Sequence, residues 1–178
     1  MGEVNSGRLG AIAAEYEKRH RHHAERELAY FRILRTDEDA ISRAALARLP
    51  SGKRHPHQYR VPLAALEESR RRLLDHLPAL RQAKSFDELF DIVAATIGSI
   101  PGVGELTVYD TALRIGARFR LEPTKVYLHA GTREGAKALG LDRGRATVEL
   151  AELPAELGTL TAREAEDLLC IYKAEFTR

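Results

Sequence analysis

The sequence of 178 residues contains few of the residue types that build covalent or metal-stabilised scaffolds. It has one cysteine, Cys170, and no tryptophan. A single cysteine excludes a disulfide within the chain and a thiolate metal cluster held by one chain. Because Cys170 lies in an apolar run with Leu169 and Ile171, we expect a buried, inert thiol rather than a nucleophile.

Long apolar runs are also missing. No stretch approaches the roughly 20 residues of a membrane-spanning helix, and the first ten residues lack the apolar centre of a signal peptide. The sequence therefore predicts a cytoplasmic protein with no membrane partner. The composition, 44% hydrophobic and 30% charged, is typical of a folded domain, and the net charge of +2 is too small to establish a polyanionic partner by itself.

Aromatic residues make up only 6% of the chain, so leucine, alanine, isoleucine and valine must supply the core, as in helical proteins. We expect an all-α fold: one compact domain with amino-terminal helices over 1–50 and a helical core over 51–178. Short strands are expected only near 124–129 and 145–150. Three helix starts show Ser or Thr followed three residues later by an acid: Thr36 with Asp39, Ser85 with Glu88, and Thr161 with Glu164. Gly140 is expected to end a helix over 132–139.

The most informative segment is a turn, Pro101-Gly-Val-Gly104, between two helical patterns that together cover residues 86–119. We expect Gly102 and Gly104 to adopt backbone angles closed to other residues, and to let a phosphate oxygen approach the amides of the second helix. Val103 is expected to point back between the two helices. The alternative is an ordinary Pro-Gly turn without a ligand.

This segment resembles the helix-hairpin-helix motif and, more distantly, the helix-hairpin-helix base-excision DNA glycosylase superfamily. The resemblance implies binding to the phosphate backbone, to DNA rather than RNA, with affinity but no sequence reading. Those glycosylases carry a catalytic lysine two residues after the second glycine and an aspartate further along the chain. Here Leu106 takes the lysine position, and only Glu122 is acidic near the aspartate position. We therefore expect no Schiff-base lyase chemistry at Leu106.

A basic segment, residues 51–60 with the sequence SGKRHPHQYR, is a loop on composition and contains no acid. Lys53, Arg54 and Arg60 predict phosphate contacts that support the hairpin. A solvated surface loop has the same composition, and this alternative stays open. The interpretation we favour is a nucleic-acid backbone-binding helix-hairpin-helix protein of bacterial type.

The stretch from Lys125 to Arg133 predicts a second candidate site. An extended segment is expected to end at His129, and Thr132 is expected to cap a helix whose amino end accepts an anion beside Arg133. His129 is a candidate general acid or base, because imidazole titrates near neutral pH. A buried, hydrogen-bonded histidine next to an ordinary helix cap is an equal alternative.

Asp110 lies in the second helix of the hairpin, four residues before Arg114, and the pair predicts a salt bridge. A catalytic carboxylate is the less favoured interpretation. If Asp110 met His129, Arg133 and Lys125 in one pocket, the protein would be an enzyme that acts on nucleic acid or a nucleotide.

No cofactor and no metal are predicted. The histidines at 20–23 and 55–57 lack an acid or cysteine at ligand spacing, and the P-loop, Rossmann, Gly-X-Ser-X-Gly and His-Glu-X-X-His motifs are missing. A long helix expected over 9–34 is polar all round at its centre. A third interpretation is therefore a helical scaffold that binds a protein partner through this amino-terminal helix.

Overall fold

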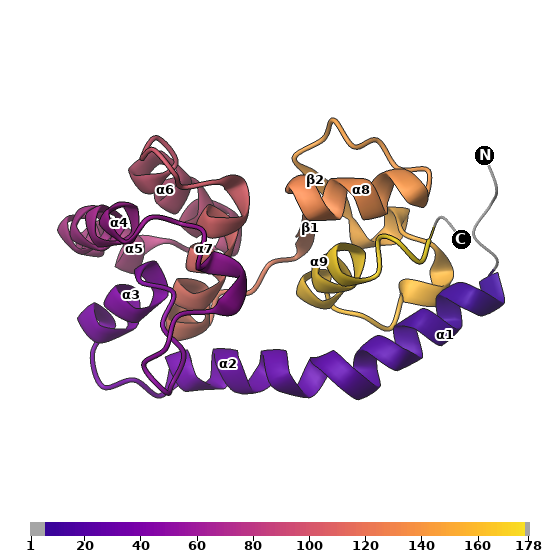
Figure 1. Cartoon of the computed structure of the whole chain (residues 1–178), viewed down its shortest axis with the longest axis horizontal. Helices are drawn as coiled ribbons and strands as arrows, with labels where there is room; N and C mark the ends of the chain where they lie inside the picture. The colour runs from indigo at the N-terminus through magenta and orange to yellow at the C-terminus, as the bar shows by residue number, and fades with distance from the viewer. Residues whose placement is uncertain (1–5, 177–178) are drawn as a thin grey trace. The chain divides into compact units, whose positions relative to one another are not determined.

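The structure, a computed structural model, describes residues 6–176 (Figure 1). Within this range the chain is mostly helical and has one two-stranded sheet, so the expected all-α class is confirmed. The described residues form two compact units, one of residues 25–122 and one of residues 6–24 together with 123–176. The division differs from the expected boundary at residue 50, because residues 6–24 pack on the carboxy-terminal segment. No helix of the described residues is both long and apolar enough to cross a membrane.

The unit of residues 25–122 is entirely helical in its regular structure. Its elements are most of α2 (His22–Arg32), then α3 (Asp37–Ala45), the 3₁₀ turn η2 (Pro56–Gln58), α4 (Leu63–Asp75), α5 (Leu77–Gln82), α6 (Phe86–Ile97) and α7 (Glu105–Phe119). Two of the predicted helix starts are confirmed. The side chain of Thr36 accepts a hydrogen bond from the Asp39 amide at 3.1 Å, and that of Ser85 accepts one from the Glu88 amide at 3.2 Å.

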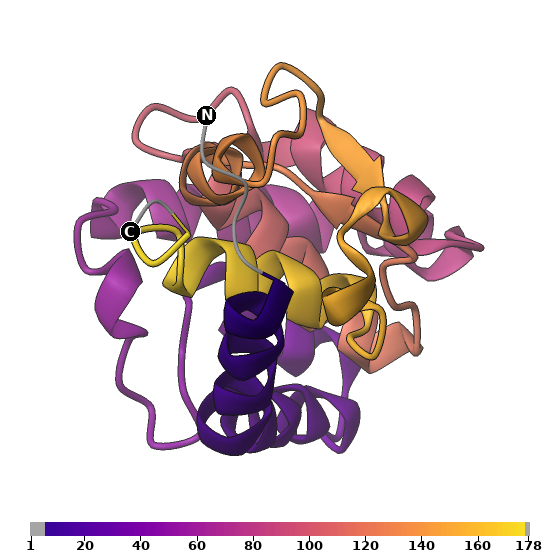
Figure 2. The ribbon, with the colours of Figure 1, turned by 90° about the vertical axis from the view of Figure 1, so that its right-hand side faces the viewer.

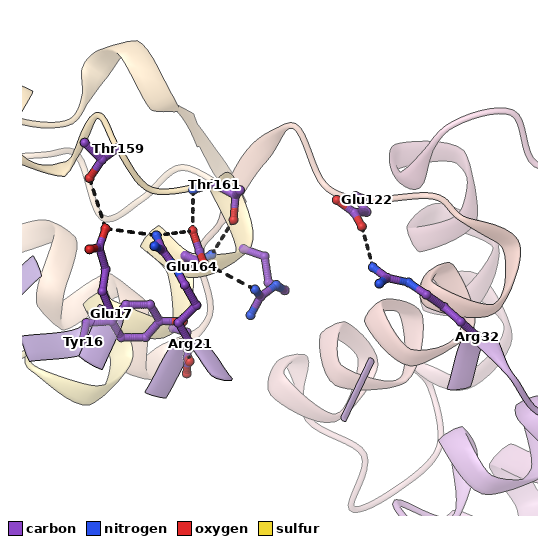
Figure 3. Close-up of polar contacts among 10 residues, drawn as sticks. Tyr16, Glu17, Arg21, Arg32, Glu122, Thr159, Thr161 and Glu164 are labelled. Atoms are coloured by element: carbon purple, nitrogen blue, oxygen red, sulfur yellow. Dashed lines mark hydrogen bonds and ion pairs between the residues drawn. The ribbon is translucent and has the colours of Figure 1, made fainter. Parts of the chain in front are cut away.

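Helix α7 occupies the centre of this unit. It packs against α6 and α3, and α4 packs against α3 and α6 (Figure 1). The large side chains that fill the core are fully buried: Phe31, Ile41, Leu66, Leu73, Leu80, Leu89, Ile97 and Ile115. Ion pairs also link the helices and the chain segments at the periphery of the unit. Arg118 Nε donates to Asp37 Oδ1 at 2.7 Å, and Arg32 Nη2 donates to Glu122 Oε1 at 2.7 Å (Figure 3).

The other unit combines helices with the small sheet. Its elements are α1 (Ser6–Tyr16), the π-helical turn η1 (Glu17–Arg21), β1 (Lys125–Tyr127), α8 (Ala130–Ala138), β2 (Thr147–Glu149), the 3₁₀ turns η3 (Leu150–Glu152) and η4 (Ala155–Leu157), and α9 (Ala162–Ile171). The strands are antiparallel with Val126 opposite Val148, and both lie where short strands were expected. Two predicted helix termini are also confirmed. Gly140, with a φ of +80°, follows the carboxy-terminal end of α8, and Thr161 caps the amino-terminal end of α9.

The amino-terminal helix docks on its own chain (Figure 2). Leu9, Ile12 and Tyr16 are buried in one core with residues of the sheet and of α9. Arg21 Nε donates to Glu164 Oε1 at 2.6 Å, a contact that fixes the end of η1 to the start of α9 (Figure 3). The apolar face of α1 is therefore covered by the chain itself, and the protein partner predicted for this helix cannot use that face.

Candidate nucleic-acid interface

The turn between α6 and α7, residues 98–104, lies on the surface of the 25–122 unit. Gly102 has a φ of +90°, a conformation that favours glycine, as expected. Gly104 differs from the expectation, because its φ of −99° and ψ of 172° suit any residue. Its importance is spatial: an added Cβ at Gly104 would meet no atom within 4 Å, so the space in front of this residue is open.

Gly104 is also the residue before the first turn of α7. No side chain caps this helix start, so the first amides of α7 lack a side-chain acceptor from the cap position. Val103 is half-buried, and its amide donates to the carbonyl of the buried Ile100 at 3.0 Å. The turn is therefore well ordered by local bonds and presents its glycines to solvent. Glu105 is exposed directly after it and places a carboxylate in the first turn of the helix.

The glycine turn lies next to Pro62, two residues after the basic loop. A Cβ added to Gly102 would lie 2.9 Å from Cδ of Pro62, the residue that precedes α4 and follows the loop. Lys53 and Arg60 are exposed on this loop. The structure thus places Pro62, which follows the 51–60 segment, against the turn.

Arg54 has a different place from the one the sequence suggested. Its Nη2 donates to the carbonyl oxygens of Gln58 at 2.5 Å and Val61 at 2.8 Å, and its guanidinium lies over the ring of Tyr59, 5.4 Å from the centroid. These contacts use the guanidinium to hold the loop in shape. Lys53 and Arg60 are the exposed cations of this loop.

Beneath the loop lies a charged cluster that the sequence analysis missed. Arg114, on α7, is only 3% exposed; its Nε donates to Glu27 Oε1 on α2 at 2.9 Å and its Nη1 to Gln58 Oε1 at 3.1 Å. The predicted partner, Asp110, is more distant, with Oδ2 at 3.8 Å from Arg114 Nη2. The partners of Arg114 lie 87 and 56 positions away in the chain, so no local pattern indicates them.

Asp110 instead anchors the loop. Its Oδ2 accepts a hydrogen bond from Gln58 Nε2 at 3.0 Å and lies 2.9 Å from His57 Nε2. The hydrogen bond that His57 donates to the Asp110 carboxylate outweighs partial burial and raises the pKa of the imidazole above its usual value of 6.5. Asp110 is thus explained by loop anchoring, and its geometry supports the structural interpretation over the catalytic one.

Glu27 carries the strongest pKa shift of the cluster. Burial raises the pKa of this carboxyl, but His55 and Arg114 outweigh burial and lower it to about 2. His55 Nε2 lies 3.1 Å from Glu27 Oε1, at an angle that is poor for a hydrogen bond. The cluster therefore holds its carboxylate ionised throughout the physiological range and ties α2, the loop and α7 together.

The second predicted site, in the other unit, has the geometry of a helix cap. His129 is 3% exposed, and its Nε2 lies 2.5 Å from Glu166 Oε1 on α9. Thr132 is fully buried and accepts a hydrogen bond from the His129 amide at 2.7 Å, so it stands inside the first turn of α8 rather than at the predicted cap position. Arg133 and Lys125 are half-buried. These contacts favour the structural alternative for His129.

The two predicted sites belong to different units. Asp110 lies in the unit of residues 25–122, whereas His129 and Arg133 lie in the other, so neither unit by itself brings the three residues together. Among residues 6–176 no three His, Cys, Asp or Glu side chains are grouped to hold a metal ion. Cys170 is half-buried rather than fully buried. No protein-family model, curated protein or solved structure matches the chain.

Proposed function

We propose that residues 25–122 bind the phosphate backbone of nucleic acid, DNA in the first place, through the turn 98–104 and the loop 51–60. The observation that carries the proposal is the close approach of Gly102 to Pro62, which places the turn before α7 next to the chain segment that follows a loop with exposed cations. A helix start attracts anions through its free amides and its dipole. Exposed Lys53 and Arg60 add the mobile cations that backbone binding uses.

Gly104→Ala tests the turn without disturbing the fold. The backbone angles of Gly104 suit alanine and nothing stands within 4 Å of the new Cβ, so the variant is expected to unfold at the wild-type temperature. The methyl group fills the space through which a phosphate oxygen approaches, and duplex DNA affinity is expected to fall by about fivefold or more, as for the loss of a charged hydrogen bond. Gly10→Ala, in α1 and equally unhindered, is the matched control. Equal affinities of folded Gly104→Ala and wild type would refute the role of the turn.

Lys53→Ala tests the loop. The logarithm of the affinity for duplex DNA is expected to fall linearly with the logarithm of the salt concentration, and this variant is expected to make the slope less negative by about 1. Lys137→Ala removes an equally exposed lysine from α8 and serves as the control. If Lys53→Ala showed the same dependence of affinity on salt concentration as wild type, the loop would not be part of the interface.

Glu105→Gln tests the sign of the electrostatics at the start of α7. The exposed Glu105 carboxylate repels a phosphate placed at these amides, so its neutralisation is expected to strengthen binding several-fold at low salt. Weaker binding by Glu105→Gln would contradict a phosphate at this position. The same titrations with duplex RNA distinguish DNA from RNA as the ligand. Tighter binding to RNA, with the same response to Gly104→Ala, would overturn the assignment to DNA but leave the backbone site in place.

A further inference from the structure

An aromatic ring stands exposed beside the proposed backbone site. Tyr59 is 59% exposed, and Leu63, four residues later, is 52% exposed. Pro62 lies between them in the chain and contacts Gly102 of the turn. Large apolar side chains grouped at one place on a surface mark a binding surface more often than single ones do. This patch is continuous with the glycine turn through Pro62.

The ring of Tyr59 is held by its own loop. Arg54 lies over the ring, 5.4 Å from its centroid, and is itself bonded to the carbonyl oxygens of Gln58 and Val61. The loop is anchored in turn on α7, since Gln58 donates to Asp110. A guanidinium occupies one side of the ring, and the remaining exposure leaves the ring accessible to a ligand. Little conformational freedom is lost when a planar ligand stacks on a ring fixed in this way.

The chain segment that carries the ring is basic. Residues 51–66 contain Lys53, Arg54 and Arg60 and no acid. A nucleotide combines a planar aromatic base, which can stack on a ring, with a phosphate, which cations attract. Stacking of bases on aromatic side chains in a positively charged groove is the general mode of single-strand binding. In an intact duplex both faces of each base are already stacked on their neighbours, so the ring has no partner there.

We propose that Tyr59 is a stacking platform for an unpaired nucleobase, and that the ligand of this surface is single-stranded DNA or a duplex with unpaired nucleotides. The inference rests on the proposed backbone site, which supplies the phosphate contacts that place the strand. The substrate class is therefore set by the loop, while the turn binds the backbone that all nucleic acids share.

Stacking has a direct optical test, because the chain contains no tryptophan. Tyr59→Trp places a single indole in the loop, and its fluorescence is expected to be quenched when the full-length protein is saturated with a thymine-rich single strand. A blunt duplex of equal length is expected to leave the emission nearly unchanged. An unquenched indole at saturation with the single strand would overturn the proposal.

The affinities give a second test. Wild type is expected to bind the single strand more tightly than the blunt duplex. Tyr59→Ala is expected to lower the affinity for the single strand about tenfold and to change the affinity for the duplex little. Tyr59→Phe is expected to keep the wild-type preference. Ile33→Ala, which removes another exposed apolar side chain, 79% exposed and outside the loop, is the control. Equal binding of both DNAs, unaffected by Tyr59→Ala but weakened by Gly104→Ala, would refute stacking and leave the backbone site intact. Absence of binding to either DNA would refute both.

Discussion

His57 joins the exposed basic loop to helix α7 through Asp110, whose Oδ2 lies 2.9 Å from the imidazole Nε2. The histidine is half-exposed, whereas the aspartate is largely covered and also accepts a hydrogen bond from Gln58. The pair therefore lies at the edge between solvent and the buried cluster around Arg114. A titratable group in this position makes the attachment of the loop sensitive to pH.

The first prediction concerns the pH dependence of stability. The pKa of His57 is raised in the folded protein, so its contact with Asp110 stabilises the fold fully below about pH 6.5 and loses that effect as the pH rises through the folded-state pKa. Compared with His57→Gln, wild type is expected to gain up to about 1 kcal/mol at about pH 5.5 and nothing at about pH 9, the gain being small because the imidazole is half-exposed. Urea unfolding at both pH values measures it.

The histidine itself supplies the control. In an NMR titration, Asp110→Asn is expected to lower the pKa of His57 relative to wild type, because the variant removes the charge that favours imidazolium. A stability difference between wild type and His57→Gln that is the same at both pH values would contradict the pair. So would an unchanged pKa of His57 in Asp110→Asn.

The second prediction concerns the buried cation. Arg114→Met keeps much of the side-chain volume but leaves Glu27 without its guanidinium partner, so the variant is expected to lose about 3–5 kcal/mol in urea unfolding at neutral pH. The pKa of Glu27 is expected to rise from about 2, since burial then acts with less opposition. Arg114→Met combined with Glu27→Gln is expected to be more stable than Arg114→Met alone. Wild-type stability of Arg114→Met would show that the pair is not desolvated.

What the sequence predicted well depends on neighbours in the chain. The starts of α3, α6 and α9 follow from hydrogen bonds that span three residues, such as the bond from the Glu88 amide to Ser85. Gly140 ends α8 because its φ of +80° strains other residues. The turn at Gly102 was found for the same reason. Such features are determined by residues that are close in the chain, so a single sequence is enough to predict them.

What the sequence did not predict depends on distant pairs. The predicted salt bridge between Asp110 and Arg114 is present at 3.8 Å, but the closer partner of Arg114, Glu27, lies 87 positions away and no local pattern indicates it. The division into units was missed because the core position of Tyr16 is set by packing and by its bond to Asp167, 151 positions away. For Arg54, composition cannot show that carbonyl oxygens of Gln58 and Val61 accept hydrogen bonds from its guanidinium.

The third prediction concerns the close packing of α8 on α9. A Cβ at Gly135 would overlap the backbone carbonyl oxygen of Leu169, which cannot move without the helix. Gly135→Ala is therefore expected to cost about 1–3 kcal/mol, the usual penalty of overpacking. At Gly131 the Cβ would lie 2.7 Å from Cys170 Sγ, a side chain that can rotate, so Gly131→Ala is expected to cost less.

Thermal unfolding ranks these variants against Gly10→Ala. Gly10 lies in α1, an added Cβ there meets nothing within 4 Å, and its replacement is expected to stabilise by about 0.5–1 kcal/mol. The order of stability is thus Gly10→Ala, wild type, Gly131→Ala, Gly135→Ala. If Gly135→Ala were as stable as Gly131→Ala, the close approach of the two helix backbones would be refuted.

The fourth prediction concerns lyase chemistry. Leu106 is half-buried in the first turn of α7, two residues after Gly104, where a helix-hairpin-helix glycosylase would require its catalytic lysine. An aliphatic side chain cannot form the imine that β-elimination requires. Borohydride reduction with DNA that contains an abasic site is expected to yield no covalent adduct of this protein. A lyase of that superfamily, which forms the adduct under the same conditions, is the positive control. A trapped adduct would overturn the prediction, and mass spectrometry would locate the amine.

The last prediction separates a structural His129 from a catalytic one. His129→Ala removes the imidazole 2.5 Å from the buried Glu166 carboxylate, so it is expected to cost about 1–3 kcal/mol. The melting temperature then falls by about 2–4 °C for each kcal/mol. Binding of phosphate and of DNA, measured well below the melting temperature, is expected to stay at the wild-type level, because both proposed contacts lie in residues 25–122. Glu166→Gln keeps the shape of the contact and is expected to lose less than His129→Ala. A His129→Ala protein that melts at the wild-type temperature but binds phosphate less tightly would instead place an anion site at the start of α8.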